Sequence, residues 1–231
     1  MKDRTHDTRS NSRRIGRGAL TVSFVIGLIS LGGCITGERP RLVTNDTIPS
    51  VDDRAINSVI ETLASAPLET SFTVSYMVVT RFGGQSFSAS IAVDPSLGTA
   101  LNFGRVRYIY AADGTLSTCS DITEECRPGI DETRVSDRQV NSRIFQSGII
   151  DRLQQDANVA VGDSLPSART VADRPTTCAS VPVVDSTGIT REKTYCAFDE
   201  LGVLAFLDTA DLLIEATVVN LGANPADFTT S

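Results

Sequence analysis

Apolar and polar residues alternate along much of the first half of this chain. In residues 72–79 the even positions are Phe, Val, Tyr and Val, and in residues 86–93 the odd positions are Phe, Ala, Ile and Val. Serine and threonine fill most of the positions between them. A period of two is typical of a β-strand with one buried face and one wet face. With shorter runs at 101–103, 106–110 and 116–119, the pattern predicts an antiparallel meander.

The second half of the chain contains a further set of strand-like segments. They lie at residues 169–172, 178–184, 190–198, 203–207 and 212–219, and the sequence Asp-Ser-Thr-Gly at 185–188 predicts a turn between the second and the third. The two halves together predict about ten strands.

Two segments have the period of a helix instead. The first begins near Ser50, the predicted N-cap, and places apolar residues at 56, 59, 60 and 63 before Pro67. The second covers residues 137–156, with Ser136 as the predicted N-cap and an apolar stripe that includes Ile144 and Phe145.

These elements predict an α+β fold. A single antiparallel sheet of about ten strands is expected to curve rather than stay flat, which makes it a half-barrel. The two helices are expected to cover the concave apolar face, because that face needs burial and few other elements are present to supply it.

The N-terminus has a different pattern from the rest of the chain. Residues 1–17 are rich in Arg, residues 19–31 are apolar, and Leu31-Gly32-Gly33-Cys34 follows. The apolar run is too short to span a bilayer and is typical of a secretory signal peptide. Leu31 to Cys34 resembles the lipobox of bacterial lipoproteins, which implies lipidation of the Cys34 thiol and cleavage just before it. Ser12-Arg13-Arg14 resembles the start of a twin-arginine signal, so both the general and the twin-arginine export routes stay open.

The chain is therefore expected to contain a signal peptide (1–33), a lipidated tether (34–49) and one α+β domain (50–231). We expect an extracytoplasmic protein, anchored to the cell membrane through Cys34. An ordinary signal peptide with an incidental cysteine is the alternative.

Charge and composition narrow the function. Residues 34–231 contain 15 Lys or Arg and 26 Asp or Glu, which disfavours nucleic acid as a partner. The one histidine, His6, lies in the predicted signal peptide, so a Ser-His-Asp triad and a histidine-ligated metal site are both excluded from the mature domain. Asp208 and Asp211 form a conceivable carboxylate pair, but aspartate is common in turns. We expect no enzyme activity, no cofactor and no metal site.

Four cysteines remain once Cys34 is set aside. Three pairings are possible, and we favour Cys119 with Cys126 and Cys178 with Cys196 because each pair is local in the sequence. A four-thiolate metal site is the alternative, although neither pair has the closer spacing usual for such sites.

The order of elements, the lipobox, the cysteine-linked hairpin and the last strand before Asp227-Phe228 together resemble the LolA-like fold. They are also similar to actinobacterial lipoproteins that carry lipids or lipoglycans. The resemblance implies a lipid or other amphiphile bound in an apolar cavity, with the 137–156 helix as a lid. The candidate lining residues are Phe72, Val74, Tyr76, Phe87, Ile91, Phe103, Tyr108, Tyr110, Ile144 and Phe145. The same residues would also suit a packed core. In that case the sheet is a scaffold for a protein-interaction or envelope-sensing lipoprotein whose partner the sequence does not name.

Overall fold

The computed structural model describes residues 52–65, 69–123 and 125–230. The predicted signal peptide, the tether, Ser50 and Cys34 lie outside these residues. In the described part of the chain, no helix has the length and apolar character needed to span a membrane.

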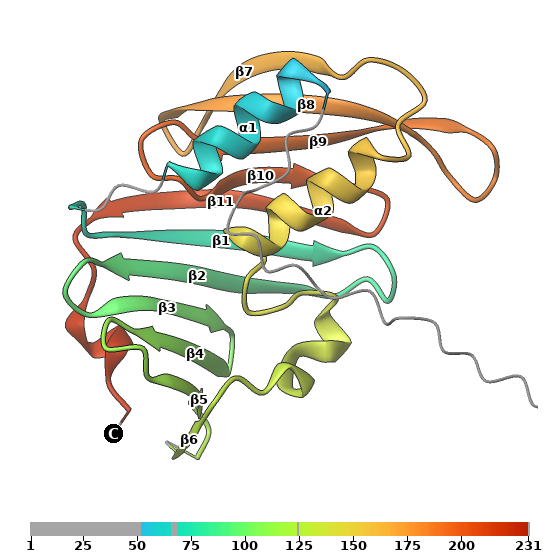
Figure 1. Cartoon of the computed structure of the whole chain (residues 1–231). Helices are drawn as coiled ribbons and strands as arrows, with labels where there is room; N and C mark the ends of the chain where they lie inside the picture. The colour runs from blue at the N-terminus through green and yellow to red at the C-terminus, as the bar shows by residue number, and fades with distance from the viewer. Residues whose placement is uncertain (1–51, 66–68, 124, 231) are drawn as a thin grey trace, which may run out of the picture. The chain divides into compact units, whose positions relative to one another are not determined.

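One antiparallel sheet of eleven strands forms the body of the domain (Figure 1). The strand order is β6-β5-β4-β3-β2-β1-β11-β10-β9-β8-β7. The strands are β1 (Phe72–Thr80), β2 (Ser86–Asp94), β3 (Gly98–Phe103), β4 (Val106–Ala111), β5 (Leu116–Ser120), β6 (Glu125–Pro128), β7 (Leu165–Val171), β8 (Arg174–Val184), β9 (Thr190–Phe198), β10 (Leu204–Asp208) and β11 (Leu212–Leu221).

The sheet consists of two meanders joined in its middle. Strands β1 to β6 pair in sequence order, as do β7 to β11, and β1 then pairs with β11. Phe72 lies opposite Leu221, and Thr80 lies opposite Leu212. The central strand pair therefore brings together residues from the two ends of the domain.

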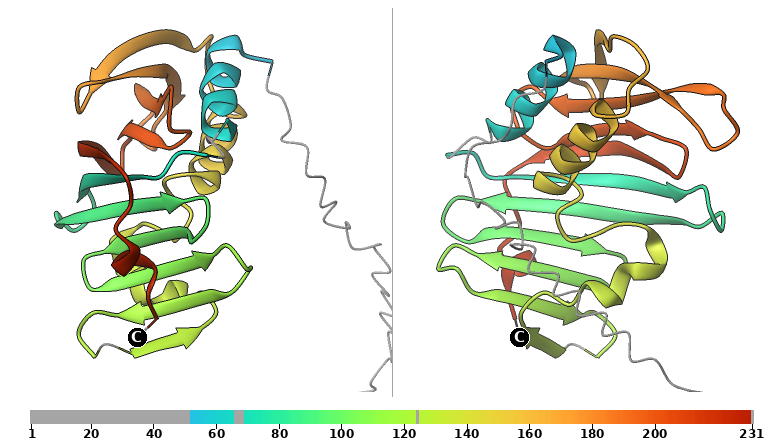
Figure 2. Two further views of the ribbon diagram at one scale, coloured as in Figure 1. Left: turned by 90° about the vertical axis from the view of Figure 1, so that its left-hand side faces the viewer. Right: turned by 45° about the vertical axis from the view of Figure 1, so that its right-hand side comes forward.

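Two α-helices pack against one face of the sheet, α1 (Arg54–Ala64) and α2 (Ser147–Ala157) (Figure 2). Asp53, not Ser50, is the N-cap of α1, and its side chain accepts a hydrogen bond from the Ile56 backbone N–H. The apolar residues predicted for this helix are buried against the sheet. The predicted α+β fold, a curved antiparallel sheet with two helices on one face, is confirmed.

The opposite face of the sheet has its own cover. The last turn, η2 (Pro225–Phe228), follows β11 and lies over β3 and β4, where the Arg107 side chain donates a hydrogen bond to the Ala226 carbonyl (3.0 Å). This contact fastens the C-terminal segment to the face that carries no α-helix.

The prediction of one helix over 137–156 is wrong in its first half. A 3-10 helix, η1 (Glu132–Arg138), ends where Gln139 adopts a left-handed backbone (φ 57°). The next residues form a turn in which the Glu132 carboxylate accepts hydrogen bonds from the Ser142 backbone N–H and hydroxyl. Regular helix begins only at Ser147, so α2 has Gln146 and not Ser136 at its N-cap position.

The spacing of apolar residues predicted a helix here, because the residues of this turn are buried at helical intervals although the turn is not helical. Val140, Ile144 and Phe145 all belong to the core. Gly148 allows this path, since a Cβ atom there would come within 2.9 Å of the Arg143 backbone.

Both favoured disulfides are confirmed. Cys119 lies opposite Cys126 in the pair of β5 with β6, and Cys178 lies opposite Cys196 in the pair of β8 with β9. The four-thiolate metal site is thereby excluded, because all four sulfurs are bonded to one another in pairs. Strand β6 was not predicted, since only four residues form it and its side chains do not alternate in burial.

Candidate functional site

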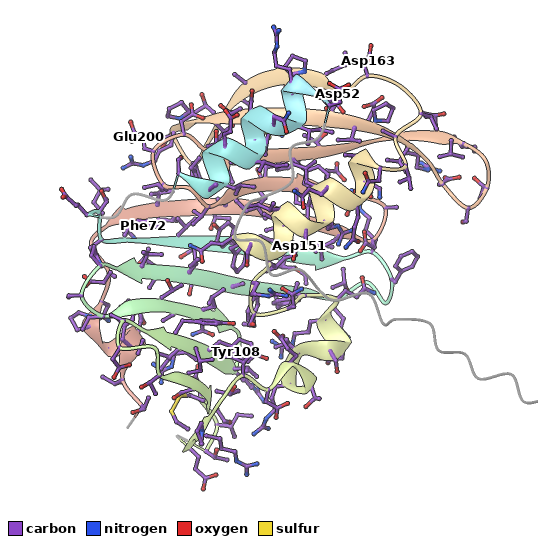
Figure 3. The ribbon with its side chains drawn as sticks, viewed as in Figure 1. Asp52, Phe72, Tyr108, Asp151, Asp163 and Glu200 are labelled. Atoms are coloured by element: carbon purple, nitrogen blue, oxygen red, sulfur yellow. A yellow bond between two sulfur atoms is a disulfide. The ribbon has the colours of Figure 1, made fainter. Side chains whose placement is uncertain are left out.

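The ten predicted lining residues lie together on the helix-covered side of the sheet. Eight of them are at most 3% exposed, and Phe87 and Tyr110 are partly buried. Figure 3 labels Phe72 on the central strand β1, Tyr108 on β4 of the same meander, and Asp151, which lies on the exposed side of α2. The structure thus brings the predicted set together in one apolar layer.

Aromatic rings fill the centre of that layer. The Phe145 ring stacks on Tyr76 with ring centroids 4.1 Å apart, and it stacks on Phe103 at 5.6 Å. Tyr108 meets Phe103 edge-on at 6.0 Å. These separations are those of direct ring contact, so in this conformation the rings pack against one another.

The phenol groups of this layer bond to the protein itself. Tyr76 donates to the Leu204 carbonyl (2.7 Å), Tyr108 donates to the Asp131 carbonyl (2.9 Å), and Tyr110 shares a hydrogen bond with the Ser142 hydroxyl (2.5 Å). Burial raises the pKa of Tyr76 well above its ordinary value, which keeps this hydroxyl a neutral donor. The Tyr108 and Tyr110 hydroxyls tie the sheet to the 131–142 segment, whereas the Tyr76 hydroxyl ties β1 to β10.

Two polar clusters fasten the C-terminal half of α2 to the sheet. Arg152 pairs with Asp211 and also donates to the Thr209 hydroxyl (3.2 Å). Asp156 accepts from the Lys193 ammonium (2.6 Å) and from the Tyr195 hydroxyl. Asp156 is only 8% exposed, so its charge needs these partners. We call these two clusters the α2 clasp.

The α2 clasp predicts a pH dependence of stability. Burial alone would raise the pKa of Asp211, but hydrogen bonding and the charge of Arg152 outweigh it, and this pKa falls below the ordinary value of 3.8. A lowered pKa in the folded state stabilises the fold above the unfolded pKa, and the contribution is lost as the pH falls through the folded value. Between about pH 5 and pH 3, the urea midpoint should therefore fall less in Asp211→Asn than in the wild type. An equal fall of the urea midpoint in the two proteins would contradict a lowered pKa of Asp211.

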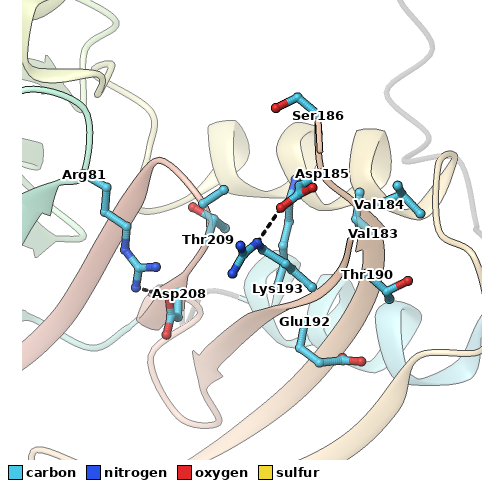
Figure 4. Close-up of a pocket in the computed structure, with 12 residues that line it drawn as sticks. Arg81, Val183, Val184, Asp185, Ser186, Thr190, Glu192, Lys193, Asp208 and Thr209 are labelled. Carbon is cyan, nitrogen blue, oxygen red and sulfur yellow. Dashed lines mark hydrogen bonds and ion pairs between the residues drawn. The ribbon is translucent and has the colours of Figure 1, made fainter. Parts of the chain in front are cut away.

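A second site, which the sequence did not reveal, lies at one end of the sheet. We call it the end groove, a depression of about 460 Å³. It opens between the turn after β1, the β8–β9 hairpin and the β10–β11 turn (Figure 4). Its lining residues are Arg81, Val183, Val184, Asp185, Ser186, Thr190, Arg191, Glu192, Lys193, Asp208, Thr209 and Ala210.

The end groove carries charges of both signs. Arg81 pairs with Asp208 (2.5 Å), and Arg191 pairs with Asp185 (2.6 Å). Hydrogen bonds from Thr187 and then Arg191 hold the pKa of Asp185 far below its ordinary value, so this carboxylate stays ionised. The Arg81, Asp208 and Arg191 side chains are each more than 40% exposed. Charged groups are thus open to an incoming molecule.

The structure also separates the two aspartates considered as a carboxylate pair. Asp208 bonds to Arg81, whereas Asp211 bonds to Arg152. Each carboxylate is held by a different cation, an arrangement that suits structural ion pairs better than a shared catalytic site.

No local sequence signal marks the end groove, because its walls come from three turns, and the turn at Arg81 lies about a hundred residues before the other two. The alternation that predicts strands says nothing about which turns meet. The run of charges at 191–193 was the one available hint.

Comparison with known proteins gives similarities of fold. No family model matches this sequence, and no curated protein matches it. Among solved structures, one of MucB has a TM-score of 0.48 and 15% identity over 76% of this chain and 62% of that chain. Another, of MucB in complex with MucA(peri), has a TM-score of 0.40 and 18% identity over 74% and 57%. The LolA superfamily protein NE2245 from Nitrosomonas europaea has a TM-score of 0.34 and 10% identity over 75% and 97%. This chain therefore spans less than two thirds of the MucB chains it matches.

Proposed function

We propose that this protein is a lipid-anchored, extracytoplasmic binding protein that recognises a protein partner through the end groove. The curved sheet is its scaffold. The observation that carries the proposal is the contrast between the two candidate sites. The predicted lining residues are packed against one another, whereas the end groove is open and lined with exposed charges.

The ion pairs of the end groove suit a polypeptide partner. Exposed ion pairs contribute little to stability, so exchanging their partners costs little. An incoming segment with charges of both signs can replace Asp208 at Arg81 and Asp185 at Arg191 without leaving either arginine unpaired. Val183 and Val184 add apolar surface beside these charges.

Location outside the cytoplasm has two supports. The sequence through Cys34 resembles a lipobox, and the domain holds two disulfides. Structural disulfides persist in oxidising compartments and are rare in the cytosol. We expect no catalysis, because residues 34–231 contain no histidine and two of the three carboxylates of the groove, Asp185 and Asp208, are bound to arginines.

Photo-crosslinking in the native host would test the partner. We would place a photoreactive residue at Ser186, which is exposed in the end groove, and at Ser96, which is exposed in the β2–β3 turn at the other end of the strands. We expect one discrete crosslinked protein from position 186 only, and its loss when Arg191→Glu reverses a groove charge. Equal products from both positions, or a product that survives the charge reversal, would contradict the proposal.

Amphiphile binding is the second candidate function, and the α2 clasp favours it. Arg152 and Asp156 hold α2 by polar contacts that can break and re-form. The buried face of the helix carries Ile149 and Leu153, and Phe145 is buried just before the helix begins. Displacement of α2 would open an apolar surface of the kind that binds lipid tails. Native mass spectrometry of the protein purified without detergent would show a lipid-sized adduct in this case. A ligand-free spectrum after incubation with host lipids would count against it.

A further inference from the structure

Large apolar side chains are exposed at the same end of the sheet as the end groove. They come from the turn after β1, the segment after α2 and the β8–β9 hairpin, which lie at the same end of the sheet in Figure 1. We call them the end rim: Phe82 (65% exposed), Val159 (57%), Val161 (55%) and Ile189 (55%). Burying such side chains would be favourable, by about 25 cal/mol for each Å² removed from water.

The loops of the end rim are fixed to one another and to the body of the domain. The Val161 backbone N–H donates to the Pro182 carbonyl (2.9 Å), and Ala160 forms a bridge with Val183. Gln139 donates its side-chain amide to the Phe82 carbonyl (3.2 Å). The apolar side chains are therefore presented on supported backbone.

The described part of the chain begins beside this rim. The Asp53 carboxylate accepts a hydrogen bond from the Ser164 backbone N–H (3.0 Å), three residues after Val161. Asp52 and Asp163 line one shallow depression and lie near each other in Figure 3. The segment that connects to Cys34 thus joins the domain next to the segment that carries Val159 and Val161.

We propose that the end rim contacts the lipid bilayer that holds the Cys34 anchor. The inference rests on the membrane anchor of the proposed function, and it adds the orientation of the domain on that membrane. The chain from Cys34 to Asp52 has 18 steps and reaches at most about 60 Å. Such a link keeps the rim at high effective concentration near the membrane, so a weak apolar contact suffices.

The end rim is suited to bind a bilayer through apolar contacts rather than through charge. Residues 34–231 carry a net excess of acidic groups, which disfavours adsorption driven by charge alone. Apolar side chains of exposed loops can enter the boundary between the headgroups and the acyl chains. The end groove would then meet its partner at the membrane surface.

The absence of tryptophan from the sequence makes a sharp test possible. Phe82→Trp puts a single fluorescent reporter on the rim. Leu221→Trp is the matched control, because Leu221 is 68% exposed and lies opposite Phe72 at the other end of β1. The two positions are roughly 30 Å apart along the strand direction.

Each full-length variant, lipidated in its host, would be reconstituted into phosphatidylcholine vesicles with brominated acyl chains. We expect at least threefold stronger quenching at position 82 than at position 221. Urea unfolding would establish that both variants are folded. Equal quenching, or stronger quenching at position 221, would overturn the proposed orientation.

Sedimentation with the vesicles separates this inference from the proposed function. If the chain sediments but position 82 is not preferentially quenched, the anchor stands and the orientation is wrong. If the chain does not sediment, the anchor is wrong and the orientation falls with it. A concentration-dependent blue shift of Phe82→Trp without vesicles would show that a second copy covers the rim, which also overturns the inference.

Discussion

Replacement of Phe145 by alanine is expected to lower the free energy of unfolding by about 3–5 kcal/mol. The Phe145 ring is fully buried and stacks on both Tyr76 and Phe103, so its removal leaves a cavity bounded by aromatic side chains. The Tyr76 ring cannot move into that space without losing its hydrogen bond to the Leu204 carbonyl. Urea unfolding of the wild type and the variant measures the difference.

Phe82→Ala is the matched control for this substitution. It removes the same side chain from a position that is 65% exposed, and we expect no measurable loss of stability. The comparison also decides between a packed core and an open ligand cavity. If Phe145→Ala lowers the free energy of unfolding by less than about 1 kcal/mol, the ring lines open space. That result would favour amphiphile binding as the function.

Replacement of Asp156 by alanine is expected to lower the free energy of unfolding by about 3 kcal/mol. The substitution leaves the Lys193 ammonium, whose side chain is 19% exposed, and the buried Tyr195 hydroxyl without their acceptor. A partly buried charge without a partner is costly. Hydrogen exchange should also show faster opening of α2, because the helix loses one of its two polar attachments.

The control for Asp156→Ala is Glu200→Ala, which removes the Arg174 ion pair at a side chain that is 65% exposed. It should have little effect, since exposed pairs contribute little. Adding Lys193→Met to Asp156→Ala should restore part of the lost stability by removing the orphaned charge. If the double variant is less stable than Asp156→Ala, the ion pair is not the source of the effect.

The sequence predicted the strands well, because alternation is imposed wherever one face of a sheet is buried. Segments 72–79 and 86–93 match β1 and β2 to within a residue. Strands at the edge of the sheet were harder to predict. Six of the seven residues of β7 are exposed, so no alternation marks where that strand begins. The helix predicted for 137–156 is too long, because Val140, Ile144 and Phe145 are buried at helical spacing but lie in a turn. Glu132, which lies outside the segment, holds this turn by hydrogen bonds.

The two candidate sites also differ in how far the sequence predicts them. The sequence placed Phe72, Tyr76 and Phe103 on one face, since strand periodicity alone fixes that. It had no means of showing that Phe145 would fill the space between them. The end groove depends on the pairing of β1 with β11, which brings Arg81 beside Asp208. Long-range pairing of this kind leaves no trace in the spacing of residues.

The pairing of β1 with β11 also has a kinetic consequence. Each meander can form from neighbouring segments, but the central ladder must wait for residues 212–221, which form the last strand of the sheet along the chain. Until then β1 presents an unpaired, largely apolar edge, the state in which strands most readily aggregate. Contacts of such long sequence separation form slowly. The closing of this central ladder is therefore the step at which chaperones would have the greatest influence on the yield of folded protein.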